Sequence, residues 1–165
     1  MKILLISAVI HITFVFAQAA QSQDHHADVN KHGDHVMGFS HEKTIHHFRL
    51  YPNGGAIEVE AIDGKDTASQ QQIRSHLTHI TSMFAAGNFQ APLLVHSQTP
   101  PGVPALQKLK DKVAYVFVET KQGGSVQIKT SNKKALEAVY QFLRFQITDH
   151  QTGDALTVSE VSATP

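Results

Sequence analysis

Residues 44–62, TIHHFRLYPNGGAIEVEAI, decide the fold, because they predict a β-hairpin. Two runs rich in strand-forming residues, 44–51 and 56–62, flank Pro-Asn-Gly-Gly, a composition typical of a hairpin loop. In the second run, apolar residues alternate with Glu58 and Glu60, so one face should be buried and the other wet. A half-buried hairpin needs a covering layer, which the rest of the chain must supply.

An amphipathic helix is expected directly after this hairpin, from about residue 67 to residue 86. The stretch Asp66-Thr67-Ala68-Ser69 offers N-cap residues, and Gly87 suits the position just past the end. Apolar side chains recur at helical spacing and form one stripe. These side chains are Ile73, Leu77, Ile80 and Phe84.

The second half of the chain has the same order of elements. Strands at 113–120 and 125–130 enclose a Gly-Gly turn, and a helix follows at 133–149. The inward stripe of that helix is expected to be Leu136, Val139, Tyr140, Leu143, Ile147 and His150. Between the halves, residues 92–96 are interpreted as a short strand. The order ββα-β-ββα predicts an α+β domain of two layers, a mainly antiparallel sheet with two amphipathic helices on one face.

The N-terminus is interpreted as a signal peptide, residues 1–20, with cleavage near Ala20 or Gln21. Its apolar run is shorter than the ~20 residues of a spanning helix, although a retained membrane anchor is the competing interpretation. The rest divides into a flexible arm rich in His and Asp (21–40), one domain (41–153) and a loose tail (154–165). We therefore expect a periplasmic or secreted protein.

The charge balance and the histidine content limit the function further. Acidic and basic residues number 14 each, which gives no electrostatic case for nucleic acid or a membrane surface. Without cysteine, neither disulfides nor thiolate metal sites are available. Twelve histidines favour transition-metal handling, since imidazole is the commonest protein ligand for such ions.

The sharpest candidate ligands are His76, His79 and Met83, which share one shoulder of the first helix. Histidines at i and i+3 can bind one ion, and a thioether favours Cu(I). The competing interpretation makes the histidines boundary residues and Met83 a filler at the core edge.

Four further histidines are candidates on other elements. His46 should face the helices, either as a ligand or as a hydrogen-bonded core residue, whereas His47 points the other way. His96 would end the 92–96 strand, where functional groups often gather. His150 ends the last helix. The negative end of the helix dipole favours a protonated imidazole there, which explains this histidine without a metal. A weak site is also expected in the arm, at His25, His26, His32 and His35.

Several stretches together make the chain resemble a family of small secreted bacterial proteins for which no activity is established. The resemblance implies export but transfers no functional residue. The stretches are MGFSHEKTIHHFRL (37–50), GGAIEVEA (54–61), IRSHLTHITSMFAAGNF (73–89), PPGVP (100–104) and FLRFQITDHQTGD (142–154).

The sequence therefore predicts an exported protein that binds copper, or secondly zinc, for sequestration or for delivery to another periplasmic protein. One alternative is a module that binds a non-metal ligand or a protein, with structural or pH-sensing histidines. A second is a small metal-dependent hydrolase that uses Glu42 as its base.

Overall fold

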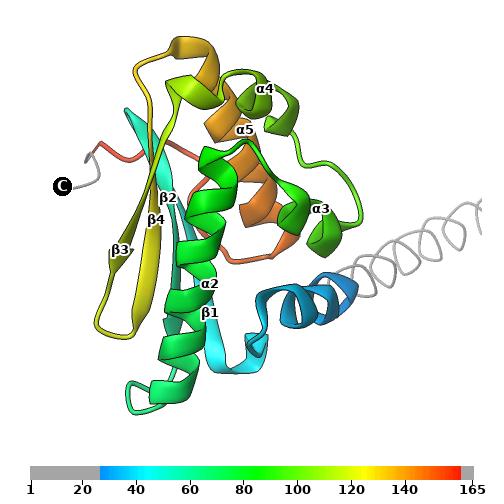
Figure 1. Cartoon of the computed structure of the whole chain (residues 1–165), viewed down its shortest axis with the longest axis vertical. Coiled ribbons are helices and arrows are strands. Elements are labelled where there is room, and N and C mark those ends of the chain that lie inside the picture. Colours follow the sequence, from blue (N-terminus) through cyan, green and yellow to red (C-terminus); the bar gives the residue numbers. More distant parts are fainter. Residues whose placement is uncertain (1–26, 161–165) are drawn as a thin grey trace, which may run out of the picture.

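A computed structural model describes residues 27–160 and shows an α+β fold of two layers (Figure 1). The four-stranded sheet is antiparallel in the order β1-β2-β4-β3. Its strands are β1 (Thr44–Tyr51), β2 (Gly54–Ala61), β3 (Ala114–Glu119) and β4 (Gly123–Lys129). Helices α2 (Thr67–Ala85) and α5 (Lys133–Asp149) pack on the sheet, with α2 over β2, β3 and β4 and α5 over β1 and β2. The predicted fold class is confirmed.

The tight turn between β1 and β2 depends on Gly54. Its φ is +151°, and a Cβ atom there would lie 1.8 Å from the carbonyl oxygen of Ile128 on β4. Only glycine combines this backbone conformation with so close an approach of the neighbouring strand. This turn also fixes the register of the hairpin, in which His46 lies opposite Val59.

The two long helices form for the reasons that the sequence indicates. The side chain of Asp66 accepts a hydrogen bond from the Ser69 N–H (3.0 Å), and Asn132 caps α5 through Ala135 in the same way. The predicted stripe of α2 is buried as expected. On α5 the predicted stripe is right only in part, because Leu136, Tyr140 and His150 are half-buried, not buried. The buried face is turned toward Ala135, Ala138 and Phe142, and α4 (Val103–Lys108) also packs on this helix. Its buried residues are Ala135, Ala138, Val139, Phe142, Leu143, Gln146 and Ile147.

The predicted strand at 92–96 is wrong, because this segment belongs to helix α3 (Gln90–His96). Pro92 lies in the first turn of α3, where a missing N–H costs no helical hydrogen bond. Val95 and His96 are buried, while Leu93 and Leu94 are exposed, a pattern that a short run of apolar residues does not reveal. His96 therefore lies at a helix end over the core, not at a sheet edge.

The expected irregular arm is helical over residues 27–37. Val29 is 1% exposed and Phe39, just after this N-terminal helix, is 5% exposed and belongs to the core. The spacing of Val29, Gly33 and Met37 is that of a helical stripe, which the polar composition hides. A 3-10 turn, η1 (His41–Lys43), then leads into β1. Residues 21–26, with His25 and His26, and the predicted signal peptide at 1–20 lie outside the described residues.

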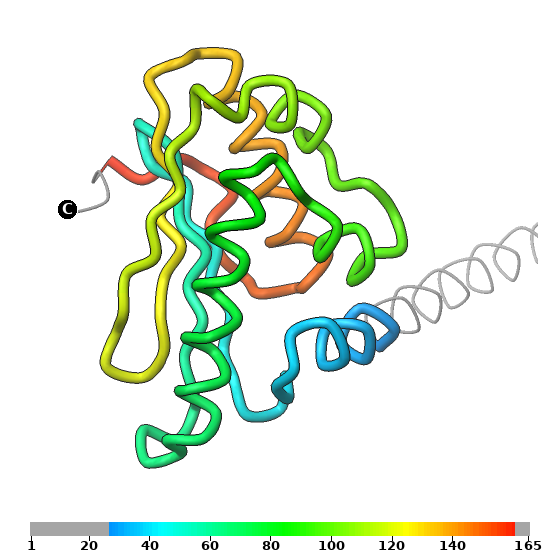
Figure 2. Tube along the Cα trace, viewed as in Figure 1, coloured from blue at the N-terminus to red at the C-terminus, as the bar shows by residue number. Residues whose placement is uncertain are grey.

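The C-terminal segment 154–160 has no regular structure, but it is attached to the free edge of β1 (Figure 2). Asp154 accepts hydrogen bonds from the Phe48 N–H (2.9 Å) and the Arg49 side chain (2.8 Å). The Ser159 N–H donates to the Leu50 carbonyl (2.9 Å). The predicted loose tail is thus held against the sheet as far as residue 160, and residues 161–165 lie outside the described part. Between residues 27 and 160 no helix has the length and apolarity needed to cross a bilayer.

Candidate functional site

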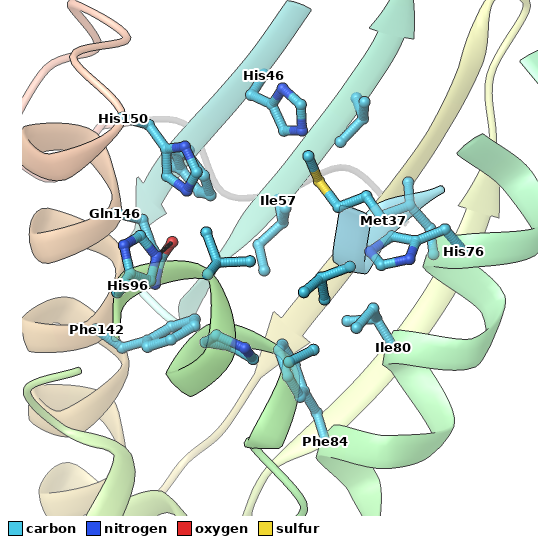
Figure 3. A pocket seen from close by; sticks show the side chains of 17 residues that line it. Met37, His46, Ile57, His76, Ile80, Phe84, His96, Phe142, Gln146 and His150 are labelled. Carbon is cyan, nitrogen blue, oxygen red and sulfur yellow. Dashed lines mark hydrogen bonds between the residues drawn. The ribbon is translucent and has the colours of Figure 1, made fainter. Parts of the chain in front are cut away.

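An apolar pocket of about 70 Å³ lies between the inner face of the sheet and the helices (Figure 3). It is lined from β1, β2, α2, α3, α5 and the N-terminal helix, so residues far apart in sequence meet there. Four histidines and one methionine interrupt its otherwise largely aliphatic and aromatic wall. The lining residues are Val36, Met37, His46, Phe48, Ile57, Val59, His76, Leu77, Ile80, Phe84, Ala91, Pro92, Val95, His96, Phe142, Gln146 and His150.

His46 enters the pocket because side chains alternate along β1. Phe48 and Leu50 share its face and are buried, as the alternation predicts. The Nε2 atom of His46 is buried and has no hydrogen-bond partner. An unsatisfied buried nitrogen costs about 1–3 kcal/mol, so this atom needs a partner that the described residues do not supply.

His76 reaches the same pocket from the middle of α2, and both imidazoles are neutral at pH 7. Burial lowers the pKa of His46 to about 4, with further lowering from the nearby His76 and His47. Burial also lowers the pKa of His76 to about 4, with a second contribution from His79. A neutral imidazole keeps a lone pair on one ring nitrogen, which is the form that binds metal ions.

Met37 lines the pocket beside His46 and His76, and Phe39 packs against both imidazoles without lining the pocket. Figure 3 shows the Met37 side chain between the imidazoles of His46 and His76. The Phe39 ring is stacked on His46, with centroids 6.1 Å apart, and meets His76 edge-on at 5.6 Å. Both imidazoles thus contact one aromatic ring, and the Met37 thioether lies between them in Figure 3.

His96 and His150 lie toward the α3–α5 side of the pocket. His96 is 3% exposed; its Nδ1 pairs with the Asp149 carboxylate and its Nε2 lies 2.9 Å from the Gln146 side-chain oxygen. Because both ring nitrogens are engaged, His96 fastens α3 to α5 and offers no lone pair. His150 is stacked on His46 (5.9 Å) and on Phe48 (5.5 Å).

The remaining predicted ligands lie outside the pocket. His79 is exposed on α2 and lines a surface groove, and Met83 is half-buried against the core. His47 is on the opposite face of the sheet, where its Nδ1 lies 2.9 Å from Asp154. His32 and His35 are on the N-terminal helix and do not line this pocket. The predicted set on α2 is therefore divided, and only His76 enters the pocket.

Sequence reasoning missed Met37, which lies on the helical stripe of Val29 and Gly33, and Phe39, which comes just after the end of that helix. It also missed Gln146, whose side-chain nitrogen Nε2 is buried without a hydrogen-bond partner. A helical-period search of residues 27–40 would have found Met37. Gln146 gave no such signal, because a single polar residue at the edge of an apolar stripe is ordinary.

Among residues 27–160, no group of three or more His, Cys, Asp or Glu side chains is placed to hold a metal ion. A metal site that uses histidines in the described part would therefore need a ligand of another kind as well, such as the thioether of Met37. No family model, curated protein or solved structure matches this chain. The pocket is interpreted from its own chemistry.

Proposed function

We propose that the protein binds one Cu(I) ion in this pocket, through His46, His76 and Met37. The observation that carries the proposal is the buried Nε2 atom of His46, which faces an apolar pocket without a partner. A bound ion would give that nitrogen a partner. The neutral imidazole of His76 has a lone pair that could bind the same ion.

The donor set favours copper over zinc, the second expected metal. Thioether sulfur is a soft ligand that selects Cu(I), whereas structural zinc sites use four Cys, His or carboxylate ligands. Four histidines line the pocket, but both ring nitrogens of His96 are engaged. Among residues 27–160 no three His or carboxylate side chains are placed to hold one ion, so Met37 is needed as a third donor. Zinc is therefore expected to bind more weakly here.

The size of the pocket favours an ion over an organic molecule. Ligand pockets usually measure about 300–1,000 Å³, and even a benzene-binding cavity measures about 150 Å³. The volume here is about 70 Å³. With a signal peptide expected at residues 1–20, the protein would sequester copper or deliver it outside the cytoplasm.

A second candidate function rests on Gln146, whose unpartnered Nε2 also lines the pocket. A small uncharged molecule of two or three heavy atoms could accept a hydrogen bond there and another from His46. The hydrolase alternative is not supported, since Glu42 is exposed on η1 and does not line the pocket.

The test is a competition titration of the untagged protein with Cu(I) and a chromophoric Cu(I) chelator, under reducing conditions without oxygen. We expect one tightly bound ion per chain. His46→Ala should abolish that binding, whereas His47→Ala, the matched control on the same strand, should retain it. A wild-type protein that leaves all the copper with the chelator, or a His46→Ala variant with wild-type affinity, would overturn the proposal.

A further inference from the structure

His76 stands between the pocket and the protein surface. On its outer side it lines a groove with Met37, Ser75 and His79, and on its inner side it lines the apolar pocket with Met37 and His46. The groove and the pocket thus share two side chains, His76 and Met37. An ion bound to either of them would be in contact with both spaces.

His79 is the outer member of this series. It is exposed and lies one turn after His76 on α2, and side chains at i and i+3 of a helix are neighbours. The two histidines are close enough for His79 to lower the pKa of His76. An exposed and a half-buried imidazole can therefore hold one ion at the mouth of the pocket.

We infer that His79 and His76 capture Cu(I) at the groove and pass it inward to His46 and Met37. This inference rests on the proposed function. The transfer is a ligand exchange without change of oxidation state: the bond from copper to His79 breaks as bonds to Met37 sulfur and His46 Nε2 form. His76 stays bound throughout, so the ion is never left without protein ligands.

A second opening gives a matched comparison. Its lining includes His41, Thr44 and His150, and it leads to His46 and Met37. There the Nδ1 atom of His41 is paired with the Asp34 carboxylate at 2.9 Å. This opening has no pair of histidines one turn apart on a helix, and we infer that it is not the loading route.

The experiment compares loading rates of the full-length chain by stopped flow, with Cu(I) supplied as a chelator complex. His79→Ala should slow both loading and release about tenfold, while the equilibrium affinity changes less than twofold. His41→Ala, the control at the other opening, should load at the wild-type rate. Circular dichroism and thermal melting should show both variants folded, because both substitutions are at positions that are not buried.

The outcomes separate this inference from the proposed function. If wild-type protein takes up no Cu(I), the proposed function and the loading route both fail. If wild-type protein binds Cu(I) but His79→Ala loads at the same rate, only the route is refuted. The same holds if His41→Ala slows loading as much as His79→Ala does.

Discussion

Acid should destabilise the metal-free protein through the two pocket histidines. The pKa of each is about 4 in the folded state, against 6.5 for an ordinary histidine. Between these values the unfolded chain binds more protons than the folded one, so stability falls as the pH falls from 6.5 to 4. The stabilisation by the neutral imidazoles is fully present above pH 6.5, and below pH 4 no further loss comes from these groups.

The size of the effect follows from the two pKa values. The shifted pKa of each histidine would lower the free energy of unfolding by about 2 kcal/mol between pH 7.5 and pH 5. Because the two imidazoles interact, and both are partly accessible, we expect a combined loss of about 2–4 kcal/mol rather than a simple sum. That is a large fraction of the ~5–15 kcal/mol that stabilises an average domain.

Urea unfolding with a chelator present, at pH 7.5, 6 and 5, measures this loss. Other groups titrate in the same range, so the informative quantity is the difference between wild type and the double variant His46→Phe with His76→Leu. The double variant should lose about 2–4 kcal/mol less over this range than wild type. His79→Gln, at an exposed position on the same helix, should lose nearly as much stability as wild type, because burial is the larger cause of the low pKa of His76 and His79 the smaller one. Equal pH dependence in wild type and double variant would refute the reasoning.

Three further perturbations test the site and its surroundings. Met37→Leu should weaken Cu(I) binding at least about tenfold in a chelator competition, whereas Met83→Leu, outside the pocket, should leave the affinity unchanged. Asp154→Ala removes the acceptor shared by the Phe48 N–H and Arg49 and should cost about 1–3 kcal/mol in urea unfolding; no change would mean that the tail does not stabilise β1. Deleting residues 27–40 removes Val29 and Phe39 from buried positions and should cost at least about 2–5 kcal/mol by thermal melting, whereas a flexible arm would leave the melting temperature unchanged.

The sheet and its two long helices could be predicted because their local signals agree with their tertiary role. Alternation in β2 and the spacing of Ile73 and Leu77 report directly which face is buried. For residues 90–96 the local signal is ambiguous, since a short apolar run fits a buried strand or a short helix equally well. Contacts between this segment and the core favour the helix α3. These contacts cannot be read from the local sequence pattern.

The candidate site could be predicted only in part. His46 faces the helices, as the alternation along β1 predicts. His76 was expected to share one shoulder of α2 with His79 and Met83, but only His76 of these three enters the pocket. Met37 was not expected there, because the polar composition of residues 21–40 conceals a helix with a narrow apolar stripe. The role of His96 depends on Asp149 and Gln146, which lie 53 and 50 positions away in the sequence. Only the fold brings these residues close to His96.

The most direct test of the copper site is X-ray absorption at the copper edge, on protein loaded with one equivalent of Cu(I). We predict two imidazole nitrogens and one sulfur as ligands, with the sulfur lost in Met37→Leu and kept in Met83→Leu. A first shell of nitrogen and oxygen alone in the wild-type protein, or a sulfur that persists in Met37→Leu, would contradict the assignment of His46, His76 and Met37 as the copper ligands.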